Sequence, residues 1–591
     1  MIDEMKINAI QREKYLSKGY WKDITLLDCW KESVKKYSER EYVVDDRGNR
    51  YTYRQMDEAA SKVAAFLRKQ GVLPGDAVSF QLPIWSEFVV VTIACFMTGA
   101  VAHPIAMSYE EKELIRSMNL TESKVYFGPS FFHKTDYASR ILAVRERIPS
   151  LSCVVIVGGE KPEAGGVLAF EEILDRWDAK TGRTDTEHAE TGRTDTEHAE
   201  TDQRETDQTE TDQTETDQRE TDQTETDRTE TESGRTGEDL ALILCTSGTT
   251  SGTKGVLLTH NNIRYSEEVF TRELGLTCED IMFMPAPLNH ATGFHHGLIT
   301  PMLIGAKVVL QQKYRCREAI DLMNRERCTF SMGATPFIYD ILRELENGGG
   351  ELPFLKLYLC GGAPVPGYMV QKAWSFGILL CEVYGSTESV PHVFVRPDEA
   401  LELNGTTSGR PMEGVEIRVV DDEGNDVPPG VPGEELSRGP NVFVGYLKDK
   451  KITDGALDDD GWFHSGDLCV RDEAGNIHII GRKKDMIVRG GENLNSNEIN
   501  DWLEGCPGMG DHTVIGMPDD RLGERICAFA VPLPGFEHLK LEDVTGWLCQ
   551  NGVPKRFWPE RLELIDRIPH TGSGKVKKYL LKEELEKRMK G

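Results

Sequence analysis

The stretch that decides the fold is residues 242–260, which read LILCTSGTTSGTKGVLLTH. Its first three residues are apolar and predict a buried strand, and the turn that follows carries six hydroxyl residues and two glycines ahead of Lys254. Backbone N–H groups freed by glycine, hydroxyl donors and a lysine are the groups that bind a polyphosphate. The pattern is not the GxxxxGK motif, because Gly255 follows the lysine. A flexible polar loop has the same composition, so this stretch alone leaves both interpretations open.

On both sides of this stretch the sequence alternates helical and strand-like segments. Residues 53–71 place apolar side chains at helical spacing and end on a glycine, whereas residues 78–82 and 154–157 have the short apolar runs of buried strands. Residues 89–102 are expected to form a buried helix, since this apolar run is too short to cross a bilayer. Such alternation predicts an α/β fold with a largely parallel sheet. A chain of 591 residues also predicts at least two domains.

The composition restricts the partners and the compartment. The formal net charge of −29 argues against nucleic acid, because binding to phosphate backbones needs clustered cations. The 13 cysteines are scattered without a CxxC pair, which favours a reducing compartment over secretion. The first residues are polar and show no signal-peptide pattern. We therefore expect a cytoplasmic protein without a membrane span.

An acidic repeat interrupts the sequence at residues 181–235. The decapeptide TGRTDTEHAE occurs twice, and pentamers such as TDQTE follow it. The tract contains no Val, Ile, Leu, Phe, Tyr or Trp, so no apolar burial offsets the entropy of ordering it. We expect a disordered insertion within a domain that resumes directly after it. A role in recruiting a partner is the alternative interpretation.

Further polar and glycine-rich motifs follow along the chain. Tyr384 offers a ring for stacking, Glu388 a carboxylate for Mg²⁺, and Asp467 a carboxylate placed at a turn, where it could bind two ribose hydroxyls. Lys575 follows a glycine-rich loop from which it could reach into a cleft. Taken singly, each motif is more often an ordinary turn or a solvated charge. The motifs are LCGGAP (359–364), VYGSTE (383–388), WFHSGD (462–467), GRKKDMI (481–487), RGGEN (489–493) and IPHTGSGK (568–575).

In this order the motifs resemble those of the acyl-adenylate-forming (AMP-binding) superfamily, which includes acyl-CoA synthetases, adenylation domains and beetle luciferases. The resemblance covers nearly the whole chain outside the repeat. It implies a large N-terminal adenylate-forming domain, residues 1–484, built on parallel-rich sheets with helices. It also implies a small, mobile C-terminal α+β domain, residues 485–591. Residues 78–88 and 329–342 look most similar to the cyclohexanecarboxylate-CoA ligase or medium-chain acyl-CoA ligase group.

The resemblance also implies a role for each motif with ATP, Mg²⁺ and coenzyme A. Lys575 would bridge the attacking carboxylate and the α-phosphate, Thr387 would contact the α-phosphate, and Glu388 would bind Mg²⁺. Lys484 would be the hinge of the C-terminal domain, and His290 would gate the acid. The other implied binding residues are Thr246, Ser247, Gly248, Thr249, Thr250 and Lys254 for the phosphates, Gly361, Gly362, Ala363, Pro364, Tyr384 and Gly385 for adenine, Asp467 and Arg482 for ribose, and Gly490 and Gly491 for the thiol tunnel.

The chemistry agrees with this inventory. A carboxylate is already a nucleophile, so the site needs cations and backbone donors that stabilise charge rather than a Ser–His–Asp arrangement. The resemblance implies that a carboxylic acid is activated as its acyl-adenylate and passed to the thiol of coenzyme A. In the dihydroxybenzoate branch an Asn follows the gating His and reads a phenol hydroxyl, but Ala291 stands there in this chain. The residues expected around the acid are apolar or small, and the likeness to the cyclohexanecarboxylate-CoA ligase group implies an aliphatic or alicyclic acid of medium size. These residues are Phe294, Met332, Gly333, Ala334 and Cys381.

Three other functions stay open at this stage. One is a stand-alone enzyme that adenylates an aryl or amino acid and loads it onto a carrier protein. Another is a catalytically inactive nucleotide-binding scaffold, although that protein would be expected to have lost Lys575, Glu388 or Asp467. A luciferase-type oxygenase would need the same adenylation site.

Overall fold

The computed structural model describes residues 5–176, 235–247, 253–362, 365–489, 492–519, 521–570 and 576–590. The acidic repeat therefore lies outside the described residues, except for Arg235 at its end. The same holds for some of the residues to which the sequence assigns a role. These are Gly248, Thr249, Thr250, Ala363, Pro364, Gly490, Gly491 and Lys575.

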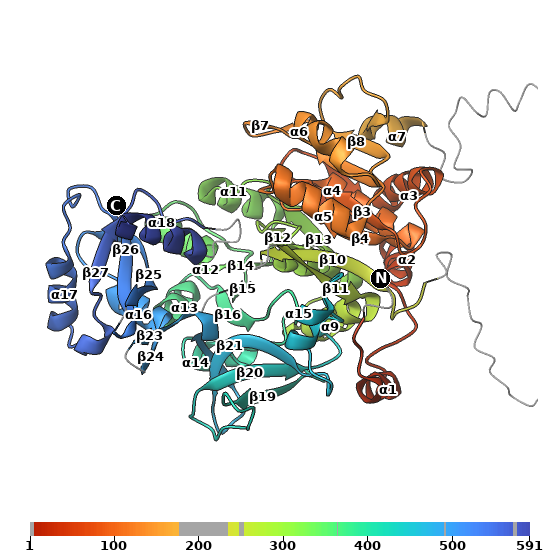
Figure 1. The fold of residues 1–591 in the computed structure, drawn as a ribbon. Helices are drawn as coiled ribbons and strands as arrows, with labels where there is room; N and C mark the ends of the chain where they lie inside the picture. The colour runs from red at the N-terminus through yellow and green to blue at the C-terminus, as the bar shows by residue number, and fades with distance from the viewer. Residues whose placement is uncertain are drawn as a thin grey trace, which may run out of the picture.

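Two parallel-rich sheets form the centre of the chain up to residue 411 (Figure 1). The first has seven strands and is parallel except for the hairpin of β10 and β11 at one edge. In spatial order its strands are β11 (Thr253–Thr259), β10 (Leu240–Ser247), β4 (Val101–Pro104), β3 (Ala77–Phe80), β5 (Val125–Pro129), β8 (Cys153–Val157) and β9 (Val167–Ala169).

The second sheet has nine strands, and its central strands are parallel. Antiparallel pairs close it at both edges. In spatial order its strands are β18 (Arg410–Pro411), β17 (Val393–Phe394), β16 (Leu379–Tyr384), β15 (Leu357–Gly361), β14 (Phe330–Ala334), β12 (Ile281–Met284), β13 (Lys307–Leu310), β1 (Glu41–Asp45) and β2 (Arg50–Thr52).

Helix α4 (Ser86–Thr98) lies between the two sheets and contacts strands of both. All its residues except Met97 are buried, as expected for a helix that is apolar on every side. The sequence analysis was wrong about its end. Gly99 adopts a left-handed conformation with φ of 69° and stops the helix, and the remaining apolar residues form β4.

Other helices cover the sheets and connect their strands (Figure 1). A π-helix, Thr292–Ile299, follows β12. A short hairpin of β6 (Phe131–Phe132) and β7 (Thr135–Asp136) follows β5. The helices are α1 (Ala9–Ser17), α2 (Leu26–Tyr37), α3 (Tyr53–Lys69), α5 (Glu111–Thr121), α6 (Tyr137–Val144), α7 (Phe170–Arg176), α9 (His260–Leu274), α10 (Thr300–Ile304), α11 (Cys316–Glu326), α12 (Thr335–Glu346), α13 (Gly367–Ser375), α14 (Ala400–Leu403) and α15 (Lys450–Ala456).

An antiparallel four-stranded sheet follows in the chain. Its strands are β19 (Glu416–Val420), β20 (Gly433–Arg438), β21 (Phe463–Arg471) and β22 (Ile477–Arg482). A 3₁₀ turn, Lys483–Asp485, then leads into the last part of the chain.

The last part of the chain has a five-stranded sheet and a hydrophobic core of its own. Figure 1 shows it in blue, as a lobe to one side of the larger sheets. It contains β23 (Met486–Arg489), β24 (Glu492–Asn495), α16 (Ser496–Leu503), β25 (Met509–Asp519), β26 (Gly523–Pro532), α17 (Leu541–Gln550), β27 (Arg561–Leu564) and α18 (Lys578–Lys590).

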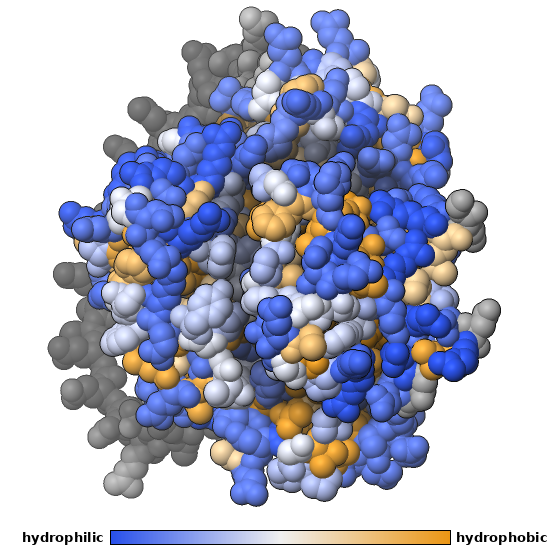
Figure 2. Space-filling view, turned by 90° about the vertical axis from the view of Figure 1, so that its left-hand side faces the viewer, coloured by the Kyte–Doolittle hydropathy of each residue, from blue (hydrophilic) through white to orange (hydrophobic). Residues whose placement is uncertain are grey.

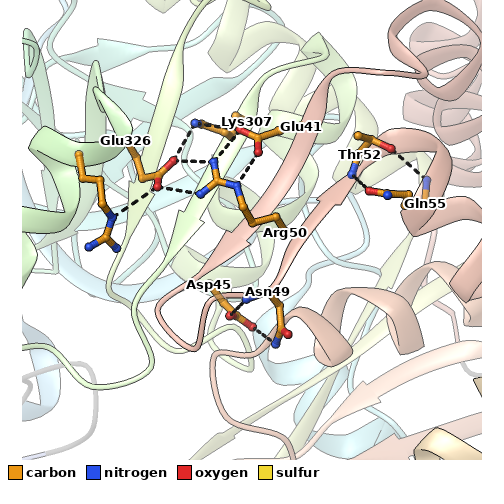
Figure 3. A network of polar contacts seen from close by, with 9 residues as sticks. Glu41, Asp45, Asn49, Arg50, Thr52, Gln55, Lys307 and Glu326 are labelled. Carbon is orange, nitrogen blue, oxygen red and sulfur yellow. Dashed lines mark hydrogen bonds and ion pairs between the residues drawn. The ribbon is translucent and has the colours of Figure 1, made fainter.

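An ion-pair network fixes the β1–β2 hairpin to the body of the nine-stranded sheet (Figure 3). Glu326, at the end of α11, is 6% exposed and accepts hydrogen bonds from Arg50 at 2.9 and 3.0 Å and from Lys307 at 3.0 Å. Arg50 also contacts Glu41. Hydrogen bonds from Arg50 lower the pKa of Glu326 to about 2, although partial burial acts in the opposite direction.

The surface is predominantly polar where Figure 2 shows it, with apolar side chains in small separate groups. No helix within the described part of the chain has the length and apolar character of a membrane span.

Candidate functional site

Two of the sequence motifs meet at the carboxyl ends of neighbouring parallel strands. Gly361, at the end of β15, is the register partner of Val383 in β16. A Cβ atom at Gly361 would lie 2.9 Å from the carbonyl oxygen of Val383, so this approach requires glycine. The following Gly362 has φ of 93°, in the left-handed region. The motifs at 359–364 and 383–388 therefore start side by side, at the sheet edge where α/β proteins bind ligands.

Tyr384, Asp467 and Arg482 come together from three strands. The Tyr384 hydroxyl donates a hydrogen bond to Asp467 Oδ2 at 2.9 Å, and Arg482 Nε lies 2.9 Å from Asp467 Oδ1. The carboxylate is 5% exposed and sits within strand β21, opposite Arg482 in β22. The prediction of a turn at Asp467 was wrong, because Gly466 adopts its left-handed conformation without ending the strand.

Glu435, which the sequence analysis missed, also contacts this group through the Tyr384 hydroxyl. It is fully buried in β20, and its Oε2 lies 3.2 Å from the Tyr384 hydroxyl oxygen, so Glu435 and Asp467 share the single phenol proton. Burial, and then the charges of Glu435 and Asp467, raise the pKa of Tyr384 well above its ordinary value. The phenol therefore stays a donor. Strand 433–438 is short and polar, so its sequence gave no signal that would have identified Glu435.

The described ends of the predicted phosphate loop belong to strands β10 and β11, and residues 248–252 lie outside the described residues. Thr246 pairs with Lys254, and Ser247 with Thr253, so the first and last residues of the motif belong to the strands. The sequence analysis expected the strand to end before these residues. The Lys254 ammonium lies 4.8 Å from the centroid of the Tyr446 ring.

Thr387 and Glu388 lie in the tight turn after β16. The turn is closed by the backbone N–H of Ser386, which donates to the carbonyl of Ser389 at 3.2 Å. Glu388 Oε1 accepts a hydrogen bond from the Tyr446 hydroxyl at 2.9 Å. Within the described residues no group of three or more His, Cys, Asp or Glu side chains could hold a metal. A single carboxylate fits Mg²⁺, because this ion commonly takes one or two protein carboxylates together with substrate phosphates.

A depression of about 340 Å³ is lined in part by Gly466, the chain neighbour of Asp467, and by Arg482, its ion-pair partner. Its lining includes Arg482, Lys484 and Ser465. Carboxylates of Asp467 and Asp485 outweigh the desolvation of Arg482 and raise its pKa. Desolvation and then the charge of Arg482 lower the pKa of Lys484, to which Lys254 also contributes. The candidate residues for ribose, hinge and phosphate are thus within electrostatic reach of one another.

His290 lies just before the π-helix. Its carbonyl accepts a hydrogen bond from the N–H of Phe294, within this helix, at 2.9 Å. π-Helical turns are rare and occur often at functional sites. The π-helix also contacts a buried carboxyl of α9 that the sequence analysis missed. Glu267 is fully buried and contacts His296 Nδ1 at 3.0 Å and the hydroxyl of Thr300. The adjacent histidines in an apolar segment were the available signal.

Glu382 is a third buried carboxyl that the sequence analysis missed. It is 4% exposed and accepts the backbone N–H of Val365 at 2.9 Å, one residue after the 359–364 motif. Burial raises its pKa to about 7, although hydrogen bonds from Ser408 and Val365 lower it. A glutamate inside the apolar run 379–383 could have drawn attention to it.

Comparison with known proteins identifies the family. Residues 30–447 match the family model described as AMP-binding enzyme, and residues 498–575 match that of the AMP-binding enzyme C-terminal domain. The chain is 39% identical over 585 residues to a medium-chain fatty-acid–CoA ligase of Escherichia coli (strain K12), covering 99% of this chain and 94% of the relative. It is 26% identical over 580 residues to a 2,3-dihydroxybenzoate-AMP ligase of Bacillus subtilis (strain 168), covering 98% and 96%.

A solved structure supports the same fold. The anthranilate CoA ligase in complex with anthranoyl-AMP aligns with a TM-score of 0.78 at 21% identity, covering 96% of this chain and 98% of that protein. The predicted α/β fold with a large N-terminal and a small C-terminal domain is thereby confirmed. The family match over most of the chain and the full-length relatives show that this protein belongs to the AMP-binding enzymes.

Proposed function

We propose that this protein activates a carboxylic acid with ATP as its acyl-adenylate and then transfers the acyl group to coenzyme A. The observation that carries the proposal is the meeting of Tyr384, Asp467 and Arg482 beside the turn of Glu388. It offers an aromatic face, a buried anion and a metal-binding carboxylate at one sheet edge. The similarity to a fatty-acid–CoA ligase over nearly the whole chain supports coenzyme A as the acceptor.

In the first half-reaction a carboxylate oxygen of the acid attacks the α-phosphorus of ATP, and pyrophosphate leaves. Asp467 would accept hydrogen bonds from the ribose hydroxyls while Arg482 holds the Asp467 carboxylate in place. Lys254 and the hairpin hydroxyls would bind the phosphates. Mg²⁺, held by Glu388 and phosphate oxygens, would supply charge neutralisation. Lys575 would stabilise the charge between the two reacting anions, a contribution of about 3–4 kcal/mol.

In the second half-reaction the thiol sulfur attacks the acyl carbonyl carbon, AMP leaves, and the thiol proton is lost. We propose that residues 485–591 turn about Lys484 between the two steps, a hinge motion at the end of an element. The chain passes through the 3₁₀ turn Lys483–Asp485 at this point. Residues 490–491 would then border the path of the thiol.

The acid is proposed to be apolar, of medium size, and aliphatic or alicyclic. Phe294 and Cys381 are fully buried, and Met332 is 4% exposed, so these side chains present hydrocarbon and sulfur rather than polar groups. A Cβ atom at Gly333 would lie 2.7 Å from the hydroxyl of Tyr358, so this position admits no larger side chain without a shift. Ala291 offers no hydrogen bond to a phenol. An aryl acid is the alternative, because relatives that act on such acids also match.

The test is an acid panel with Mg·ATP and coenzyme A, followed by AMP release and mass detection of thioesters. The panel runs from acetate through hexanoate, octanoate and cyclohexanecarboxylate to benzoate and 2,3-dihydroxybenzoate. We expect AMP together with acyl-CoA, with the highest kcat/KM for the middle of the panel. Pyrophosphate release without acyl-CoA would favour a carrier protein as acceptor, and no acid-dependent ATP cleavage would contradict the proposal.

Lys575→Ala should slow acid-dependent ATP–pyrophosphate exchange by about 10²–10³-fold, as expected for one lost transition-state donor. The matched control is Lys587→Ala, because this lysine is exposed on α18. Equal activities of the two variants would exclude the role proposed for Lys575.

A further inference from the structure

Residues 442–447, called here the strap, join the phosphate hairpin to the turn of Glu388. On one side the strap lies alongside β11 and pairs with it. The N–H of Leu257 donates to the carbonyl of Gly445 at 3.0 Å, and the N–H of Leu447 donates to the carbonyl of Gly255 at 2.8 Å. On the other side the N–H of Phe443 donates to the carbonyl of Glu388 at 2.8 Å. The strap therefore connects strand β11 with the turn of Glu388, two segments that are far apart in the sequence.

Tyr446 joins the side chains of the same two loops. It is 4% exposed, its hydroxyl donates to Glu388 Oε1 at 2.9 Å, and its ring centroid lies 4.8 Å from Lys254 Nζ. The ring also packs edge-on against Phe443 at 4.9 Å. The hydroxyl is the donor in this contact, because an ionised carboxylate oxygen only accepts hydrogen bonds.

We propose that Tyr446 is a positioning residue that sets the metal-binding carboxylate Glu388 and the phosphate-binding Lys254 relative to each other. The inference rests on the proposed function, in which Glu388 holds Mg²⁺. The hydrogen bond from the phenol to Oε1 orients the carboxylate that would hold Mg²⁺. The face of the ring holds the ammonium by a cation–π contact, where it would meet the phosphates of ATP.

A buried tyrosine often has a purely structural role, and the chain contains such a residue for comparison. Tyr265 is 3% exposed, and its hydroxyl donates to a backbone carbonyl, that of Glu413, at 2.6 Å. Tyr446 donates instead to the carboxylate that the motif assigns to the metal. Groups that hydrogen-bond a metal ligand orient it, and their loss commonly costs about 10–100-fold in metal affinity. Tyr265→Phe is therefore the matched control for Tyr446→Phe.

The test measures ATP binding in the absence of acid, where no turnover occurs. Isothermal titration gives the Kd of ATP with and without Mg²⁺, and the ratio of the two is the metal-dependent gain in affinity. Because Glu388 is one of several ligands, we expect Tyr446→Phe to reduce this gain by about 3–10-fold, below the full range for a lost partner. Tyr265→Phe should keep the wild-type gain. An unchanged gain in Tyr446→Phe would overturn the proposal.

Two further variants separate this inference from the proposed function. Glu388→Gln should lose most of the metal-dependent gain, and combining it with Tyr446→Phe should add nothing, because the hydroxyl acts through the carboxylate. An additive loss in the double variant would contradict that coupling. A wild-type gain in Glu388→Gln would instead refute Glu388 as the metal ligand, and with it the metal site of the proposed function.

Tyr446→Leu removes the ring as well as the hydroxyl. It should weaken metal-free ATP binding by a further factor of about 2–5, because the partly exposed Lys254 loses its cation–π contact. Circular dichroism and thermal unfolding show whether each variant is folded. If a folded Tyr446→Leu binds metal-free ATP as Tyr446→Phe does, the ring does not position Lys254.

Discussion

Replacing Glu382 by Gln should change the pH dependence of stability more than stability itself. Glu382 lies in β16, one strand away from the 359–364 motif, with 4% of its surface exposed. Its Oε2 accepts the N–H of Val365, and burial raises its pKa to about 7. Glutamine keeps the size and an acceptor oxygen for Val365. The substitution therefore removes the titration and little else.

The magnitude follows from linkage between protonation and folding. The pKa of Glu382 rises from 4.5 to about 7 on folding. Because one pKa unit corresponds to about 1.4 kcal/mol, the difference amounts to about 3 kcal/mol. A raised pKa means that the folded state keeps its proton longer than the unfolded state. The stability due to this group is complete below about pH 4.5 and is lost progressively as the pH rises through about 7.

The measurement is urea unfolding of both proteins at about pH 5 and about pH 8. We expect the free energy of unfolding of Glu382→Gln, relative to that of wild type, to be about 2–3 kcal/mol larger at the higher pH than at the lower, because only wild type loses this stability as the carboxyl ionises. Other titrating groups are common to both proteins and cancel in the difference. Glu318→Gln, at an exposed position on α11, controls for the change of a surface charge. Parallel pH profiles of wild type and Glu382→Gln would refute the reasoning.

Three further predictions concern stability, nucleotide binding and the repeat. Glu326→Gln should destabilise the fold by about 1–3 kcal/mol at neutral pH, discounted because its partner Arg50 is half exposed. Since the pKa of Glu326 is lowered to about 2, this stability should vanish as the pH falls from about 4.5 through 2, which acid titration of unfolding can check. Asp467→Asn should raise the KM for ATP by about 10–100-fold, because a hydrogen bond to a charged group contributes a free energy of that size. An equal rise in the KM for the acid would contradict the assignment of Asp467 to the ribose. Replacing residues 181–230 by a Gly-Ser linker should leave kcat/KM within about two-fold, because the tract has no large apolar side chains to pack; a tenfold loss would show that it contributes.

The fold class could be predicted because local patterns carry it. Helix α3 and strands β3 and β8 lie where apolar spacing placed them, since helices and strands each impose a period on their buried faces. The errors came from long-range context. The apolar run 89–102 contains a helix, a left-handed Gly99 and a strand, and buried strands and buried helices look alike in such a run.

The site was predictable in part for the same reason. The motif residues Tyr384, Asp467 and Arg482 are brought together as the resemblance implied. The carboxyls of Glu382 and Glu435 were not foreseen, because their partners lie 17 and 51 residues away in the sequence and only the packed sheets bring them close. A single buried charge is costly without such partners, so its position depends on the assembled fold rather than on the local sequence.

The placement of the ribose residues bears on the proposed hinge. Asp467 receives hydrogen bonds from Tyr384 of the nine-stranded sheet and pairs with Arg482 of β22, so all three belong to the part of the chain before Lys484. A rotation that begins at Lys484 would leave this group in place. The adenylate would stay bound while Lys575 leaves and the thiol approaches. The contacts of Asp467 therefore explain how one nucleotide site could serve two half-reactions without releasing its intermediate.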